Sequence, residues 1–279
     1  MIKTWFITGI SSGLGRNMTE QLLARGDRVA GTARRLHALD GLVSRYVTQL
    51  SVAALDVTDS AAVRRVVDGA FNSLGRIDVI VNNAGYGLFG AAEELNDEQM
   101  RQQIDTNLVG SIQVIRAVLP HLRAQGGGRI LQVSSEGGQI AYPGFSLYHA
   151  TKWGIEGFVE AVSQEVAPFN IEFTIIEPGP TATDFGKGMI STPATAVYES
   201  TPVGEIRRAW SSGRFSVRGD ARKTARAMID CADQRSGPGR LTLGSDAYER
   251  VHAALTARLT VLQGQKATAR STDLDPLDR

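Results

Sequence analysis

The chain has 279 residues, 42% of them hydrophobic, with 30 glycines and 9 prolines, and it carries 30 basic against 29 acidic side chains. This length can bury a substantial core in one large α/β domain or in two small ones, and the composition excludes a disordered or fibrous protein. A formal charge of +1 creates no molecule-wide field for nucleic acid or anionic lipid, so we expect neither as a partner.

Cysteine and histidine give no sign of a disulfide or a metal site. Cys231 is the only cysteine, and the four histidines are too far apart to match metal-ligand spacing. Residues 1–8 run into a predicted strand without the basic and apolar regions of a signal peptide, and no apolar run is long enough to cross a bilayer. We therefore expect a cytoplasmic protein that uses no metal and no membrane.

The first candidate site is a glycine-rich turn near the N-terminus. A short apolar run at residues 5–7 precedes it, and apolar residues at helical spacing follow it. A strand, a glycine-rich turn and a helix in that order let the backbone approach a diphosphate, which the free N–H groups at the helix start bind. Glycines also serve ordinary turns, so the motif favours dinucleotide binding only in this context. The run is Thr8-Gly9-Ile10-Ser11-Ser12-Gly13-Leu14-Gly15.

Two arginines follow the second predicted strand, residues 28–33. In a dinucleotide-binding fold an acidic residue near this strand end holds the ribose 2′-hydroxyl, whereas an arginine accommodates a 2′-phosphate. Ala33 stands where the acid would be, and Arg34 and Arg35 come next. Because guanidinium groups match phosphate oxygens, we interpret Arg34, helped by Arg35, as selecting NADP over NAD. The alternative is two solvated arginines at the start of a loop.

Four further apolar runs predict strands at residues 50–55, 77–81, 129–133 and 171–176. Helical patterns lie between them: Thr58 or Asp59 caps the first, a second spans residues 97–124, and a third begins near Phe145. Six alternations of strand and helix predict a Rossmann-type, doubly wound parallel sheet of about seven strands with helices on both faces. Sites in such sheets lie at the carboxyl ends of the strands, where five polar or glycine signals fall: Gly13, Asp56, Asn82, Ser135 and Pro178.

Tyr148 and Lys152 stand four positions apart on the third helix, and therefore on one face of it. A tyrosine with an ordinary pKa near ~10 is a poor base at neutral pH, and a nearby cation favours the phenolate. Lowering that pKa toward about 7 takes roughly 4 kcal/mol of differential interaction, which the ammonium and a cationic cofactor ring can share. Taken alone, the pair also fits any amphipathic helix turn.

With these residues collected, the chain resembles the short-chain dehydrogenase/reductase family in its compact form, from Thr8 to Thr183. The resemblance rests on Thr-Gly-x-x-x-Gly-x-Gly, Asn-Asn-Ala-Gly, an asparagine, a serine and Tyr-x-x-x-Lys in the family's order. Ser135 precedes Tyr148 by thirteen positions, the family's spacing, which selects Ser135 over Ser134.

The resemblance implies roles for the catalytic residues. Tyr148 would exchange a proton with the substrate oxygen while the nicotinamide exchanges a hydride with its carbon. Lys152 would lower the phenol pKa and bind the ribose hydroxyls, and Ser135 would stabilise charge on the substrate oxygen. Asn107 would bend its helix and hold a water that connects Lys152 to solvent. Without the resemblance, Asn107 would be interpreted as a polar residue that is tolerated in the middle of a helix.

The resemblance also implies a set of residues for the cofactor, NADP(H). The phosphate turn would comprise Gly9, Ser11, Ser12, Gly13, Leu14 and Gly15. Asp56 and Val57 would contact the adenine, and Asn82, Ala84 and Gly85 the adenosine side, although part of that motif supports the sheet. Pro178, Gly179, Thr181 and Thr183 would hold the carboxamide, and Tyr148 and Lys152 the nicotinamide ribose.

We expect a single domain over residues 1–262, with a substrate lid at about 184–217 and a polar, flexible tail at 263–279. Beyond the lid the sequence predicts a helix at 221–231, a seventh strand at 241–243 and a last helix at 246–262. The apolar residues of the lid either form a hydrophobic cover or pack a pair of short helices. These are Phe185, Met189, Ile190, Tyr198 and Trp210.

The leading hypothesis is an NADP(H)-dependent oxidoreductase that interconverts a small-molecule carbonyl and an alcohol. A non-catalytic NADP-binding sensor or scaffold on the same fold is the alternative, although such a protein would be free to lose the four catalytic residues. A sugar-nucleotide epimerase is disfavoured by the glycine spacing and by the short chain after Thr183. Family habit implies a homodimer or homotetramer.

Overall fold

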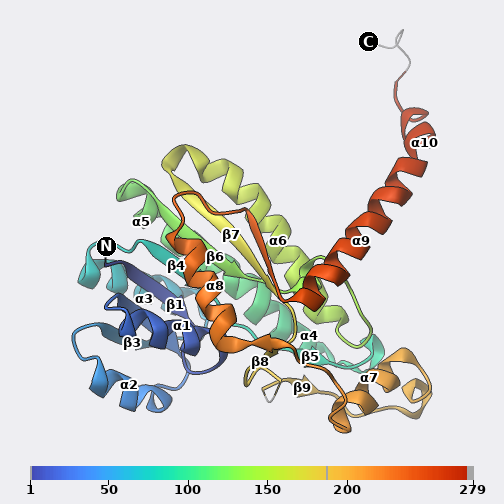
Figure 1. The fold of residues 1–279 in the computed structure, drawn as a ribbon, viewed down its shortest axis with the longest axis horizontal. Coiled ribbons are helices and arrows are strands. Elements are labelled where there is room, and N and C mark those ends of the chain that lie inside the picture. Colours follow the sequence, from blue (N-terminus) through green and yellow to red (C-terminus); the bar gives the residue numbers. More distant parts are fainter. Residues whose placement is uncertain (1, 187, 275–279) are drawn as a thin grey trace.

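A parallel β-sheet forms the centre of the protein (Figure 1). The computed structural model describes residues 2–186 and 188–274. Within them the sheet has seven strands in the order β11-β7-β6-β4-β1-β2-β3, and every neighbouring pair is parallel. The strands are β1 Thr4–Thr8, β2 Arg28–Ala33, β3 Leu50–Ala54, β4 Val79–Asn82, β6 Gly128–Val133, β7 Ile171–Pro178 and β11 Arg240–Leu243.

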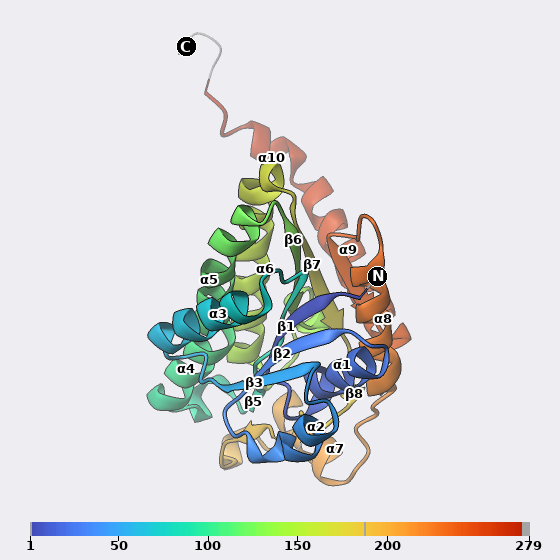
Figure 2. The same ribbon diagram turned by 90° about the vertical axis from the view of Figure 1, so that its left-hand side faces the viewer.

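Helices cover both faces of the sheet (Figure 2). Side chains alternate along each strand, so Phe6 and Ile80 join the core under α3, α5 and α6, whereas Trp5 and Val79 join the core under α1, α2 and α8. This arrangement confirms the predicted doubly wound fold. The helices are α1 Gly13–Ala24, α2 Asp40–Arg45, α3 Ser60–Leu74, α4 Asp97–Ile104, α5 Ser111–Ala124, α6 Ser146–Val166, α7 Pro202–Ser211, α8 Ala221–Asp233, α9 Ser245–Gly264 and α10 Lys266–Arg270.

The chain changes direction across the sheet between β1 and β4. From β1 the sheet is built outward through β2 and β3, and the chain then returns to pair β4 against the other side of β1. Such a reversal leaves a crevice at the carboxyl ends of the two central strands. Thr8 and Asn82, the last residues of β1 and β4, border this crevice.

Local hydrogen bonds determine where one predicted strand and one predicted helix begin. The predicted fourth strand begins at Val79 instead of Ile77, because the side chain of Gln125 bonds both the N–H and the carbonyl of Ile77. Asp59, one of two candidates, caps α3 by accepting bonds from the N–H groups of Ala61 and Ala62.

The predicted helix at 97–124 is interrupted by a π-helical stretch, Asp105–Gly110. Asn107 lies inside it, with its side-chain amide bonded to both backbone groups of Tyr86. Extra residues in a helical turn re-aim the side chains around them, and such turns are frequent at functional sites.

The segment between β7 and α8 crosses the carboxyl ends of the strands (Figure 1). It contains α7 and two-residue strands: β8 Thr181–Ala182 pairs with β10 Gly219–Asp220, and β9 Ile190–Ser191 pairs with β5 Leu88–Phe89. The predicted pair of short helices is therefore one α-helix preceded by a short 3-10 turn, Ala196–Tyr198.

The C-terminal helix α9 leaves the body of the protein and α10 continues beyond it (Figure 1). The predicted tail, 263–279, thus begins with helix, and residues 275–279 lie outside the described part. In the described chain no helix has the length and apolarity to cross a membrane, and no cluster of histidine, cysteine and acidic side chains suits a metal ion.

Candidate functional site

A cavity of about 1260 Å³ opens at the carboxyl ends of the strands. Pockets for one small ligand usually measure about 300–1,000 Å³, so this cavity has room for a large ligand and a smaller one together. Most of the predicted site residues line it. They are Gly9, Ser11, Ser12, Gly13, Leu14, Arg34, Arg35, Asp56, Val57, Ala84, Gly85, Ser135, Tyr148, Lys152, Pro178, Gly179, Thr181 and Thr183.

The glycine-rich turn connects β1 to the N-terminus of α1. Gly9 and Gly13 have φ angles of 74° and 58°, which favour glycine, and a Cβ on Gly9 would lie 3.1 Å from the Cα of Ala84. Gly15 does not line the cavity. A Cβ there would lie 2.4 Å from the carbonyl oxygen of Gly9, so this glycine allows α1 to pack against the turn.

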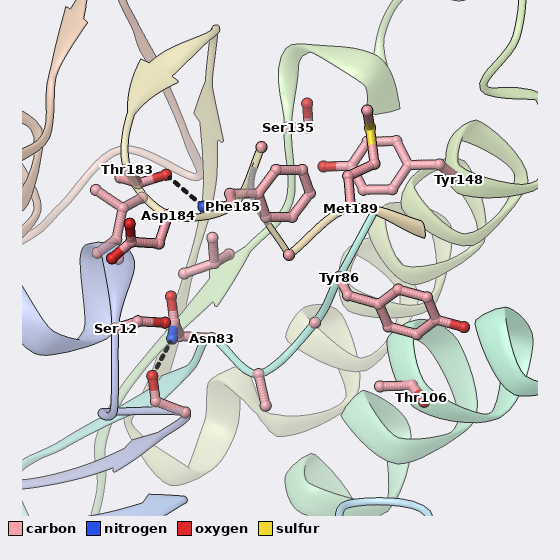
Figure 3. A pocket seen from close by; sticks show the side chains of 18 of the residues that line it. Ser12, Asn83, Tyr86, Thr106, Ser135, Tyr148, Thr183, Asp184, Phe185 and Met189 are labelled. Atoms are coloured by element: carbon pink, nitrogen blue, oxygen red, sulfur yellow. Dashed lines mark hydrogen bonds between the residues drawn. The ribbon is translucent and has the colours of Figure 1, made fainter. Parts of the chain in front are cut away.

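Asn82 does not line the cavity either. Its side chain is buried and donates to the carbonyl of Ser111 and to the side chain of Gln132, which braces the sheet against α5. Its neighbour Asn83, which belongs to the same predicted motif, residues 82–85, lines the cavity (Figure 3) and donates to the carbonyls of Thr8 and Gly9. Strand alternation is the signal for this difference, since Asn82 shares its face with the buried Ile80.

Arg34 and Arg35 lie just after β2, and both side chains are exposed at the cavity. Ala33 is the buried last residue of that strand. Arg34 is close enough to Tyr86 for its charge to favour the phenolate, although burial dominates and raises the pKa of Tyr86. Positive charge therefore lies at the position predicted from the sequence for contact with a 2′-phosphate.

Ser135, Tyr148 and Lys152 meet in one place. Lys152 lies on the same face of α6 as Tyr148, with Nζ 5.5 Å from the ring centre, and donates to the carbonyl of Val133 at 3.0 Å. Ser135 lies close enough to Tyr148 for its hydroxyl to favour the phenolate. Tyr148 and Lys152 are both more than nine-tenths buried, so these groups interact with little screening by water.

Burial determines the charge states of this pair. It raises the pKa of Tyr148 to about 12, with the nearby Ser135 opposing and the charge of Glu136 adding to the rise. Burial also lowers the pKa of Lys152 to about 8, with Glu156 opposing. The protein's own side chains thus keep Tyr148 a neutral phenol, because loss of hydration of the phenolate dominates its pKa. The lowering predicted from the sequence also involves a bound cationic cofactor ring and stays a prediction.

Two buried carboxylates lie beside the catalytic groups, and the sequence prediction missed both. Glu136, directly after Ser135, accepts bonds from Arg250 of α9 at 2.9 and 3.0 Å. Glu156, one helical turn after Lys152, accepts from Ser134 and Arg240. The sequence signal for these two carboxylates was their position in the chain, directly after Ser135 and one helical turn after Lys152.

Asn107 is buried and lies behind the cavity wall. Its bonds to Tyr86 fix the chain that follows β4, and a Cβ on Gly85 would lie 3.2 Å from its side-chain oxygen. In the structure Asn107 shapes the cavity wall through these contacts.

The predicted lid supplies apolar side chains to the cavity. Phe185, Met189 and Trp210 line it, whereas Tyr198 packs in a small core with Phe89 and Phe145. Ile190 is 38% exposed and does not line the cavity. Three of these residues thus face the cavity, and the action of this segment as a substrate lid stays a prediction.

Comparison with known proteins identifies the family. The model described as short chain dehydrogenase matches residues 3–193. Oxidoreductase BOA17 of Botryotinia fuckeliana is 38% identical over 250 residues, which cover 89% of this chain and 91% of the relative. A crystal structure of a short-chain dehydrogenase from Streptomyces avermitilis matches with a TM-score of 0.91 and 38% identity, over 98% of this chain and all of that one.

A serine dehydrogenase complexed with NADP+ is 25% identical, with a TM-score of 0.74, over 86% of this chain and 94% of that one. The chain belongs to the short-chain dehydrogenase/reductase family and is an oxidoreductase of it.

Proposed function

We propose that the protein is an NADP(H)-dependent oxidoreductase that interconverts a carbonyl and an alcohol, with Tyr148 as general acid and base. The observation that carries this proposal is the meeting of Ser135, Tyr148 and Lys152 at one wall of a cavity whose other wall is the glycine-rich turn. A sensor or scaffold would not need these three groups in contact.

The residues present fit the cofactor. Side chains at Gly9 and Gly13 would be strained at their positive φ angles, and the bare turn leaves N–H groups at the start of α1 for a diphosphate. Arg34 and Arg35 are placed to hold a 2′-phosphate, and residues 178–183 to hold the carboxamide. When bound, the nicotinamide supplies or accepts the hydride.

The side chains supply the proton chemistry. In the reducing direction Tyr148, neutral at working pH, donates its phenol proton to the substrate oxygen. Ser135 donates a hydrogen bond to the same oxygen as negative charge develops on it. The Lys152 ammonium then stabilises the remaining phenolate, and the reverse reaction returns the proton to Tyr148.

Tyr148→Phe tests the chemistry. The variant should bind NADPH as the native protein does and lose about 10²–10⁴-fold in turnover across a panel of ketones, aldehydes and alcohols. Tyr248→Phe, an exposed tyrosine outside the cavity, is the matched control. Undiminished turnover by Tyr148→Phe would remove this residue from the reaction.

Cofactor choice is tested by equilibrium titration. The double variant Arg34→Ala/Arg35→Ala should bind NADPH about 10–100-fold more weakly, the loss of one or two charge-assisted bonds, with NADH binding unchanged. Equal losses for both cofactors would refute a role in selecting the 2′-phosphate.

We also propose the larger organisation. One catalytic domain over residues 1–262 is supported by the two cores that share a single sheet, with residues 184–217 as the substrate lid. We infer a reducing, cytoplasmic setting from Cys231, a free and buried thiol. A homodimer or homotetramer is the expected assembly, and light scattering on the purified protein measures it.

A further inference from the structure

We propose that the substrate carries a bulky, uncharged apolar body next to its carbonyl or alcohol carbon, and that this body packs between α6 and the lid. The inference rests on the proposed oxidoreductase function and adds the chemical class of substrate. It is argued from the two aromatic walls that flank Tyr148.

The first wall is formed by two aromatic rings of the segment that precedes α6. Tyr142 and Phe145 both line the cavity, with ring centres 5.5 Å apart in an edge contact, and Phe145 lies 6.2 Å from the ring of Tyr148. Phe145 is buried in the small core with Phe89 and Val203. Apart from the hydroxyl of Tyr142, this wall is therefore apolar, and the small core holds Phe145 in place beside Tyr148.

The second wall belongs to the lid. Phe185 lies 6.0 Å from the ring of Tyr148, and Met189 lies beside it (Figure 3). A Cβ on Gly87 would lie 3.0 Å from the Phe185 ring, and one on Gly186 would lie 3.1 Å from the Trp210 ring. Each ring thus packs against the backbone of a glycine, and this contact fixes its position at the cavity.

These lid side chains are exposed where they meet the cavity. Phe185 is 42% exposed, Trp210 36% and Val217 46%, and all three line the cavity. Contiguous exposed apolar side chains usually mark a binding surface. An apolar ligand body would cover them and gain the free energy of their burial.

Glu136, the carboxylate that follows Ser135, is already paired. Glu136 is 1% exposed and is bonded by Arg250, so it is poorly placed to recruit a cationic substrate. Polar groups of a sugar or an acid set against the rings of Phe145 and Phe185 would lose water without gaining a partner. The surroundings of Tyr148 therefore favour a hydrocarbon or aryl body over a polar one.

A homologous series of 2-alkanones, from 2-butanone to 2-decanone, tests the inference with NADPH. Burial of each methylene should raise kcat/KM about 4-fold until the pocket is filled. Phe185→Ala should flatten this slope, lowering kcat/KM for 2-decanone about 10–100-fold more than for 2-butanone. Val197→Ala, at an exposed lid residue that does not line the cavity, should keep the native slope.

Binding of the same ketones to the Tyr148→Phe variant, measured by calorimetry with NADP+ present, separates the two proposals. Affinity that grows with chain length while the native protein turns over nothing would support the apolar site and refute the proposed reaction. Turnover that is flat with chain length, or faster with 2-oxo acids of matched length, would overturn the apolar site and leave the reaction standing.

Discussion

The pairing of Glu136 with Arg250 links the segment that carries Ser135, the proposed catalytic serine, to the C-terminal helix α9. Burial raises the pKa of Glu136, and Arg250 opposes that rise, while Asp246 on the same helix adds to it. The Glu136 charge in turn raises the pKa values of Tyr142 and Tyr148. Arg250 thus offsets a carboxylate that disfavours the phenolate of Tyr148.

Replacing Arg250 should therefore move the pH profile of catalysis. In Arg250→Met the charge of Glu136 is no longer compensated and raises the pKa of Tyr148 further. Because alcohol oxidation needs the phenolate, the rise of kcat/KM with pH for this reaction should shift by about one unit to higher pH. The double variant Glu136→Gln/Arg250→Met should return it. Equal profiles for all three proteins would show that the pair does not act on Tyr148.

Residues of the site were predictable where they share a local pattern. Tyr148 and Lys152 are one helical turn apart, and Ser135 ends a recognisable strand, so their meeting follows from the parallel sheet. Glu136 and Arg250 are 114 positions apart, and their contact depends on how α9 docks, which no local pattern specifies. The charge state of Tyr148 was also out of reach, because it depends on burial.

At the scale of the elements, one carboxylate bonds the proposed lid to the body of the protein. Glu94, in a short 3-10 turn after β5, accepts bonds from Arg207 of α7 and from the backbone and hydroxyl of Thr195. Burial disfavours its charge, but these bonds and one from the N–H of Ala91 outweigh burial and lower the pKa to about 2. Two points within the proposed lid, Thr195 and Arg207, are thereby tied to the body of the protein through Glu94.

Glu94→Gln should loosen the lid. Because the pKa is depressed in the folded state, the carboxylate stabilises the protein fully above its ordinary pKa of 4.5 and progressively less as the pH falls toward about 2. At pH 7 the variant should melt roughly 2–4 °C lower, the effect of about 1 kcal/mol in a chain of this size, and the gap should close on acidification.

Hydrogen exchange should quicken across residues 195–211 in this variant, whereas Glu205→Gln, at an exposed position on α7, should match the native protein. A gap in melting temperature that is as large at pH 2 as at pH 7, or that appears equally in Glu205→Gln, would contradict the role of Glu94.

Strands and helices were predictable to within a few residues because their apolar runs are local. The π-helical stretch was not, since Asn107 adopts it while bonding Tyr86, 21 positions away. The lid was predictable only as a loop rich in small residues. Its course depends on two-residue pairings such as β9 with β5, which carry no sequence signal of their own.

At the scale of the whole molecule, α9 divides into a docked and a free part. Ala247 and Val251 are buried, and a Cβ on Gly179 would lie 2.9 Å from the Cβ of Ala247. From residue 255 to 274 every described side chain is exposed, with Leu255 at 47% and Leu262 at 64%. The first two turns of α9 therefore pack on the domain. Beyond them Arg258 still donates to the carbonyl of Gln139 and lies over the ring of Trp153, and the helix then extends away from the domain.

Removing residues 264–279 should consequently leave the domain intact. Changes at exposed positions usually stay within about 0.5 kcal/mol, so the melting temperature should move by no more than about 1–2 °C and NADPH binding should not change. Ending the chain at residue 244 should instead cost both stability and turnover, because it removes Ala247, Val251 and the partner of Glu136. Differential scanning calorimetry of the two truncations against the full chain makes the comparison. A large loss of stability in the shorter deletion would place residues 264–279 inside the cooperative unit and move the proposed domain boundary beyond residue 262.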